Sequence, residues 1–372
     1  MRLRRARGGP SPVVDRAEPD PYQLSRRATF TLVGFFLAIA VAAVASMVSL
    51  PYVVRQPGPV VNILGDLGGK RLITVSGATT YPTEGALDFT TIRDLGGPGD
   101  RLNVWELLWG AVDPGSEVFD EADIYPPGVT GKQVEEESAA QMVDSQQEAI
   151  AAAMRALGKP VTERVTIASV AKDAPSASLL RAGDVVVAAD GQKVDGAEAL
   201  RDAVQAHEPG ETVALTLDRK GTTVEVDART RGSDGRTTVG VFLGREFDFP
   251  FPVQIEAGRV GGPSAGMMFA LGIYDTLTPG ALTGGKQVAG TGTISAEGEV
   301  GPIGGIRQKV VGARDGGAKW FLAPAANCDD LAREGAVPDG LRVVRVERLA
   351  QAIDAVEAIA ADKGDSLPSC TG

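Results

Sequence analysis

The sequence is poor in the residues that metal and redox sites need. Its 372 residues include one histidine, His207, and two cysteines, Cys328 and Cys370. A single histidine excludes an HExxH zinc site and any cluster of several histidines. The two cysteines form neither a CxxC motif nor a disulfide framework. We therefore expect no metal and no cofactor, and a Ser-His-Asp triad would depend on His207 alone.

A net positive charge is confined to the first 27 residues. Those residues hold seven arginines and three acidic residues, a net charge of +4. Since the whole chain carries −11, residues 28–372 carry −15. Contacts to phosphates need clustered lysine and arginine, so this acidic body excludes nucleic acid as a partner. At 43% hydrophobic residues, the chain is ordinary globular material with room for two or three domains.

One long apolar segment follows the arginines. Residues 28–54 contain no charged side chain, and about 20 apolar residues cross the hydrocarbon core of a bilayer. By the positive-inside rule, we expect a cytoplasmic tail at 1–27, a single transmembrane helix at 28–54 in the cell membrane, and a body outside the cytoplasm. Ala43-Val44-Ala45 has the small-x-small form of a cleavage site, so a cleaved signal peptide stays open as the alternative.

Two further segments show no catalytic motif. Residues 55–160 combine short β-like runs with a helix that opens at a capping box, Thr130-Gly131-Lys132-Gln133, and runs to Leu157. We expect a small α+β region that packs behind the anchor. Residues 359–372 are expected to form a flexible tail. Outside the cytoplasm, Cys370 in this tail is able to pair with Cys328, which the sequence leaves open.

Residues 161–230 resemble a PDZ domain. The resemblance rests on small residues after Ala174, on Gly183-Asp184 before an apolar strand, and on the turn Asp190-Gly191. It implies an open sheet edge to which an extended peptide adds as a strand. The glycine-rich carboxylate-binding loop of that family is not found before Val165, so binding of free C-termini stays open. We expect the peptide to contact a strand and a facing helix at Val165, Ile167, Leu200 and Val204.

Two glycine-rich loops carry residues that suit catalysis. Gly261-Gly262-Pro263-Ser264-Ala265-Gly266 precedes an apolar run of helical length, which places Ser264 near a helix N-terminus. Backbone N–H groups there favour the negative charge that attack by a serine creates. The structural alternative is an N-cap serine.

The second loop, Gly301 to Gly305, leads into a helix with Lys309 one turn inside it. A lysine replaces histidine as the base of a serine nucleophile when burial lowers its pKa from about 10.4 towards neutrality. The structural alternative is a solvated surface lysine.

Together the two loops resemble the proteolytic domain of Lon-family serine proteases. The resemblance covers residues 235–358 and includes Gly290-Thr291-Gly292-Thr293 between the two loops. It implies a ribosomal-protein-S5-domain-2-like α/β fold, in which Ser264 is the nucleophile and Lys309 the general base. It also implies that Thr291 helps to hold the lysine and that Gly262 supports the nucleophile loop.

Typical Lon proteases also carry an ATPase module, for which this sequence offers no Walker A motif. The nearest strings place Arg71 and Gln287 where GxxxxGK[ST] needs a hydroxyl. An anchor, a PDZ-like module and a Lon-like domain in this order resemble the bacterial Lon-like, PDZ-containing membrane proteases (the YlbL-type group). The resemblance implies an α+β multidomain, homo-oligomeric, ATP-independent serine endopeptidase that cleaves peptides or unfolded proteins delivered by the PDZ-like module.

Two other functions stay open at this point. A non-catalytic adaptor, which recruits partners through the PDZ-like module, is favoured if Ser264 and Lys309 lie far apart or if Lys309 is solvated. A phosphate-binding loop at residues 260–266, as in small-molecule kinases, is disfavoured because ATP is absent outside the cytoplasm. Neither the physiological substrate nor the cleavage specificity follows from the sequence.

Overall fold

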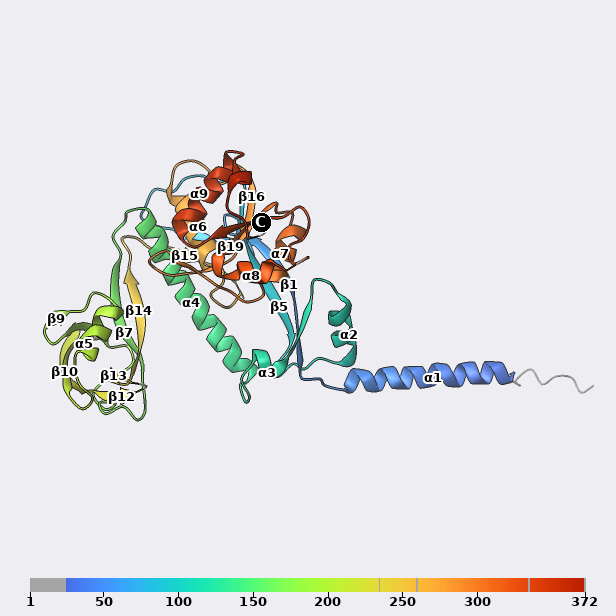
Figure 1. Cartoon of the computed structure of the whole chain (residues 1–372), viewed down its shortest axis with the longest axis horizontal. Coiled ribbons are helices and arrows are strands. Elements are labelled where there is room, and N and C mark those ends of the chain that lie inside the picture. The colour runs from blue at the N-terminus through green and yellow to red at the C-terminus, as the bar shows by residue number, and fades with distance from the viewer. Residues whose placement is uncertain (1–24, 234, 259, 334, 371–372) are drawn as a thin grey trace, which may run out of the picture.

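The computed structural model describes residues 25–370 except 234, 259 and 334. The expected tail at 1–27 lies almost wholly outside the described residues. Figure 1 shows three parts along the molecule: the helix α1, a central α/β body, and a smaller lobe at the opposite end. The body and the lobe contain both helices and strands, as the α+β class predicted.

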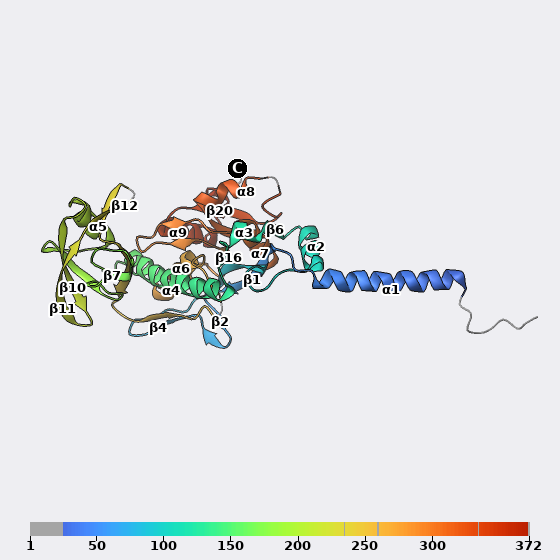
Figure 2. The same cartoon turned by 90° about the horizontal axis from the view of Figure 1, so that it is seen from below.

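Helix α1 (Arg26–Met47) contains most of the apolar segment. Its N-cap residue, Ser25, accepts a hydrogen bond from the Ala28 N–H. None of its residues is buried, and it projects away from the body (Figure 2). Among the described residues it is the one helix that is long and apolar enough to cross a membrane, a test that signal sequences also pass. The expected end of the helix at residue 54 is wrong, because Val53 and Val54 are fully buried in the body.

One six-stranded sheet joins the segment after the anchor to the C-terminal part of the chain. Its order is β20-β19-β16-β5-β1-β6. Strand β1 pairs antiparallel with β5 on one side and with β6 on the other. Strand β16 pairs in parallel with β5 and with β19, and β19 pairs in parallel with β20. The six strands are β1 (Tyr52–Asn62), β5 (Ala86–Gly96), β6 (Glu117–Asp120), β16 (Gln287–Gly290), β19 (Trp320–Pro324) and β20 (Arg342–Val346).

The expected separate unit at 55–160 is therefore wrong. Strand β5 lies beside β16 in the centre of the sheet, where Leu87 is opposite Val288. Both side chains are fully buried. Without β5, β16 would be an edge strand with unpaired backbone groups and exposed apolar side chains. The N-terminal strands thus belong to the same body as the two glycine-rich motifs with Ser264 and Lys309.

Helices cover both faces of this sheet. Val288 faces the core that contains residues of α4 (Gly131–Ala156), α6 (Gly266–Leu277) and α9 (Leu349–Ala360). The next residue, Ala289, faces a second core with α7 (Ile306–Asp315) and α8 (Cys328–Leu331). This alternation is what a strand buried on both faces requires. The loop with Ser264 leads into α6, and Lys309 lies in the first turn of α7; these two helices lie on opposite faces of the sheet.

Several short elements complete the body. Helix α2 (Val104–Val112) and helix α3 (Glu121–Ile124) flank β6. The short strands pair as β2 (Asp66–Leu67) with β3 (Lys70–Arg71), β4 (Ile73–Val75) with β15 (Val253–Ile255), and β17 (Thr293–Ile294) with β18 (Val300–Gly301).

The smaller lobe lies between α4 and β15 in the chain. Its sheet has the order β11-β10-β8-β7-β14. It extends to Asp248 rather than to residue 230, because β14 pairs with β7 along nearly its whole length. The elements are β7 (Thr162–Val170), β8 (Val185–Ala189), β9 (Gln192–Lys193), α5 (Ala197–Gln205), β10 (Thr212–Arg219), β11 (Thr222–Arg229), β12 (Arg231–Ser233), β13 (Arg236–Thr238) and β14 (Val241–Asp248).

The expected flexible tail at 359–372 is wrong for its described part. A disulfide joins Cys328 to Cys370, and the short helix η2 (Gly364–Ser366) packs its Gly364 against the ring of Trp320. Arg342 donates a hydrogen bond to the Asp365 carbonyl at 2.7 Å. Residues 371 and 372 lie outside the described residues.

Candidate active site

The loop before α6 presents Ser264 without using it as a helix cap. Helix α6 begins at Gly266 with Ala265 as its N-cap residue, and no side chain caps it. The alternative of an N-cap serine is therefore wrong. The Gly262 N–H donates to the Ser138 carbonyl at 2.9 Å, and the Ser145 hydroxyl donates to the Pro263 carbonyl at 2.9 Å. Both serines belong to α4, which thus holds the nucleophile loop in place.

Gly262 has a conformation that favours glycine. Its φ is 78°, in the left-handed region, where most side chains are strained. Two residues further on, the Ser264 hydroxyl contacts the Lys309 amine of α7. The supporting role of Gly262 stays a prediction.

Lys309 lies buried beside the Ser264 hydroxyl. Its Nζ is 2.7 Å from Ser264 Oγ and 3.0 Å from Thr291 Oγ1. The Thr291 hydroxyl donates to the Ser264 carbonyl at 2.9 Å, which leaves its oxygen free to accept a hydrogen from the amine. Only 2% of Lys309 is exposed, so the alternative of a solvated surface lysine is wrong. The structure thus brings together the three residues that the sequence singled out.

Burial changes the protonation of this lysine. It lowers the pKa of Lys309 from 10.5 to about 7, because an ammonium group loses its hydration there, and the positive charge of Arg55 adds to the effect. Arg55 belongs to β1 and is held by two hydrogen bonds to Asp94 on β5, at 2.9 and 2.8 Å. At pH 7 about half of the Lys309 amine is therefore unprotonated and able to accept a proton.

A cleft of about 670 Å³ opens at Ser264. Its walls come from β1, β5, α4 and both catalytic loops, and they include Arg55, Val61, Phe89, Thr91, Ser138, Val260 and Gly304. Sequence analysis missed the walls from β1, β5 and α4. Arg55 directly follows the apolar segment in the sequence and belongs to neither glycine-rich motif, so nothing in the motifs indicated its position in this cleft.

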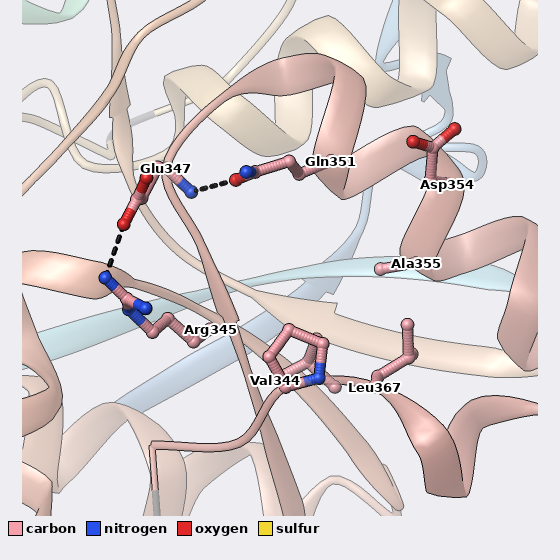
Figure 3. Close-up of a pocket in the computed structure, with 8 residues that line it drawn as sticks. Val344, Arg345, Glu347, Gln351, Asp354, Ala355 and Leu367 are labelled. Carbon is pink, nitrogen blue, oxygen red and sulfur yellow. Dashed lines mark hydrogen bonds and ion pairs between the residues drawn. The ribbon is translucent and has the colours of Figure 1, made fainter.

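A smaller cavity of about 270 Å³ lies elsewhere in the body, between β20, α9 and the segment after η2 (Figure 3). Arg345 and Glu347 form an ion pair at its edge, and the Glu347 N–H donates to Gln351 at 2.8 Å. Its lining contains no serine, threonine or lysine. This cavity therefore has no nucleophile that resembles the one at Ser264.

The predicted peptide-binding residues of the lobe lie in its core. Val165, Ile167, Leu200 and Val204 are all buried. Strand β7 is paired on both sides, with β8 and β14, so the open sheet edge expected near Val165 does not exist. For Val165 and Ile167, the predicted contact with a peptide strand is wrong.

A groove of about 540 Å³ lies instead between α5 on one side and Ser233 and residues 236–243 on the other. Leu200 and Val204 contribute to its helical wall, and their predicted role in peptide binding stays a prediction. The chain enters β14 through Gly240, whose φ is 76°. Phe242 on β14 lines the groove and is 65% exposed. Whether this groove binds free C-termini stays open.

His207 does not take part in a triad among the described residues. It belongs to the lobe, where its Nε2 lies 2.8 Å from Asp190 Oδ2. The pKa of His207 is raised, mainly by this hydrogen bond.

Two protein families match the chain. Residues 131–230 match the PDZ domain, and residues 253–359 match the Lon protease (S16) C-terminal proteolytic domain. The PDZ match includes α4, although α4 packs against α6 of the body. The chain therefore combines a PDZ domain with a Lon-type proteolytic domain, as the sequence predicted. These two matches do not include an ATPase domain.

Two Lon proteases and one PDZ domain are among the proteins that are similar to parts of the chain. Lon protease 2 of Syntrophobacter fumaroxidans is 39% identical over 102 residues, 27% of this chain and 12% of that protein. The Lon protease of Treponema pallidum is 34% identical over 110 residues, 30% of this chain and 12% of that protein. The chain thus spans about an eighth of the length of these relatives. The PDZ domain of an SdrC-like protein from Listeria monocytogenes aligns with 25% identity and a TM-score of 0.21, over 21% of this chain and 85% of that one. The Lon matches support a serine-type peptidase.

The buried amine has a consequence for stability. Between pH 7 and 10.5, Lys309 binds a proton in the unfolded chain but not in the folded one. The unfolding free energy should therefore rise with pH across this window. We expect Lys309→Met to raise the unfolding free energy at pH 7 by about 1–4 kcal/mol, because it removes the cost of keeping the amine unprotonated.

The measurement is urea unfolding of the detergent-solubilised chain at pH 7 and at pH 10. The difference in unfolding free energy between Lys309→Met and the wild type should be smaller at pH 10 than at pH 7. Lys319 is exposed, so Lys319→Met is the matched control. It should leave the unfolding free energy unchanged at both pH values. A Lys309→Met variant that is less stable at pH 7 than the wild type would show that the amine is not penalised by burial.

Proposed function

We propose that this chain is a membrane-anchored, ATP-independent serine endopeptidase with a Ser264–Lys309 dyad. The observation that carries the proposal is the 2.7 Å contact between Lys309 Nζ and Ser264 Oγ at a buried lysine. The same contact counts against the adaptor alternative, which required the two residues to be far apart or the lysine to be solvated.

In the proposed mechanism, Lys309 acts first as a base. Its neutral amine donates one hydrogen to Thr291 Oγ1 and directs its lone pair at the Ser264 hydroxyl. As Ser264 Oγ attacks the scissile carbonyl, its proton passes to Lys309 Nζ. The ammonium then protonates the departing amine, which leaves an ester on Ser264. Water resolves this ester, with Lys309 again as the base.

Backbone groups at the start of α6 supply the oxyanion site. Among the described residues, neither the Ser264 N–H nor the Ala265 N–H donates a hydrogen bond. Both precede the first helical residue, Gly266, so the dipole of α6 adds positive potential there. Each such donor lowers the barrier by about 3–4 kcal/mol when it meets the developing oxyanion.

The location outside the cytoplasm rests on two further features. Helix α1 has 22 residues, long enough at 1.5 Å per residue to cross a bilayer core of about 30 Å. The Cys328–Cys370 disulfide fits an oxidising compartment. With an uncleaved α1 the body is held at the outer face of the membrane, whereas a cleaved signal peptide would release it.

The substrates we propose are peptides and unfolded proteins. A PDZ groove holds extended chains, and the free edge of its sheet here is β14, which faces α5 across the groove. Arg245 of β14 forms an ion pair with Glu148 of α4, at 2.5 Å, and α4 in turn holds the nucleophile loop. Delivery to Ser264 along this connection needs no unfolding motor when the chain is already loose. From the family resemblance we also propose a homo-oligomer.

The dyad predicts a specific pattern of loss. Ser264→Ala and Lys309→Met should each lower kcat for a short fluorogenic peptide by at least about 1,000-fold, because neither residue works without the other. The kcat of the double variant should lie within about twofold of the kcat of the less active single variant. Ser295→Ala and Lys319→Met, which change the same residue types elsewhere in the domain, should retain full activity. Turnover by Ser264→Ala at the wild-type rate would contradict the proposal.

The delivery role predicts an effect that depends on substrate length. Phe242→Asp places a charge in the PDZ groove and should lower kcat/KM for a long unfolded protein by about tenfold. For a short fluorogenic peptide the change should stay within about twofold, since Ser264 is untouched. Val187→Asp, at an exposed apolar residue outside this groove, is the matched control. Equal losses for both substrates would mean that the lobe shapes the catalytic body instead of delivering substrate.

A further inference from the structure

Helix α2 is short, and a capping box at its N-terminus stabilises it. Asn103 caps it: its Oδ1 accepts hydrogen bonds from the N–H groups of Trp105 and Glu106, at 2.9 and 3.1 Å. The Glu106 carboxylate accepts in return from the Asn103 N–H at 2.9 Å, which completes a capping box. The only charged side chain of α2 is thus committed to the cap.

The outer face of α2 is an apolar stripe. Trp105, Leu108, Trp109 and Val112 recur at intervals of three and four residues, which places them on one side of the helix. They are 48%, 51%, 71% and 68% exposed, respectively. Four large apolar side chains exposed together are unusual for a surface in water, so the stripe indicates an interaction surface.

The inner face of α2 is fixed to the catalytic sheet. Gly110 is buried, and a Cβ at this position would lie 2.4 Å from Cγ1 of Val54 on β1. Val54 precedes Arg55, which lines the cleft at Ser264. The orientation of α2 therefore fixes the orientation of the catalytic body.

The stripe begins beside the apolar helix α1. The Trp105 indole N–H donates to the Ala42 carbonyl of α1 at 3.3 Å, and Figure 1 shows α2 beside the C-terminal end of α1. Ala42 lies five residues before Met47, the last residue of α1. At 1.5 Å per residue this is about 7.5 Å along the helix.

We propose that the stripe of α2 (Trp105, Leu108, Trp109 and Val112) is buried in the outer interface of the bilayer that α1 spans. The inference rests on the membrane anchoring proposed above. Amphipathic helices lie about 5–10 Å deep at the boundary of headgroups and acyl chains. The distance of about 7.5 Å from Ala42 to the end of α1 falls within this range. Tryptophan prefers this boundary because its ring is apolar and its N–H is polar.

This second attachment has a consequence for the enzyme. One transmembrane helix alone leaves the body free to tilt, whereas α1 and α2 together hold the cleft at a fixed orientation to the membrane. The substrates that such a cleft reaches most readily are unfolded segments at the outer membrane surface.

The test uses the full chain with Trp320→Phe, so that Trp105 and Trp109 are the remaining tryptophans. It is reconstituted into phosphatidylcholine vesicles whose acyl chains carry bromine, which quenches nearby tryptophan. Bromine near the headgroup end of the chains should lower the fluorescence by about twofold or more relative to unbrominated vesicles, and bromine near the terminal methyl should lower it less. The variant Trp105→Phe/Trp109→Phe, which retains Trp320, is the control and should not be quenched.

Flotation of the same vesicles separates the two proposals. Protein that floats with the vesicles and is quenched supports the inference. Protein that floats but is not quenched leaves the anchor intact and overturns the inference. If Trp109→Glu then changes the oligomeric size of this unquenched protein, the stripe is a contact between copies of the chain. Protein that does not float contradicts both the anchor and the inference.

Discussion

The burial of a lysine amine against a serine hydroxyl is the constraint on which this structure depends. Burying an ammonium group is costly, and the surrounding fold must keep water away from Lys309 for its pKa to remain near 7. Gly305, with φ of 69°, starts α7 so close to Ile92 of β5 that a Cβ would lie 2.8 Å from its side chain. Close packing of this kind excludes water from the base.

The need for that enclosure explains why the N-terminal strands belong to the catalytic body. Strand β1 brings Arg55 to the cleft, β5 brings Phe89 and Thr91, and α4 anchors the nucleophile loop through Ser138 and Ser145. The two motifs contain the proposed nucleophile and base, but much of the wall around them comes from residues 52–156, which add to Val260 and Gly304. A fragment that begins at the Lon-type match would therefore lack one side of its own active site.

The sequence predicts what local motifs determine and misses what distant pairing determines. Ser264 and Thr291 stand in glycine-rich loops, and Lys309 follows such a loop by one helical turn. These patterns are local, and the structure brings all three residues together. The pairing of β5 with β16 joins segments about 200 residues apart, and nothing in either strand alone indicates its partner. The same limit applies to the lobe: β14 becomes the edge strand only because it pairs with β7. Val165 and Ile167 show an alternating pattern that a core strand and a binding strand share.

The central claim is that Lys309 activates Ser264. The most direct test is the pH dependence of covalent labelling of the full chain by a fluorophosphonate, followed by mass spectrometry of the labelled peptide. The account predicts a label on Ser264, a labelling rate that rises with pH through a midpoint at about 7, and no measurable label in Lys309→Met. A label at another residue, or a midpoint above pH 10 on Ser264, would contradict it.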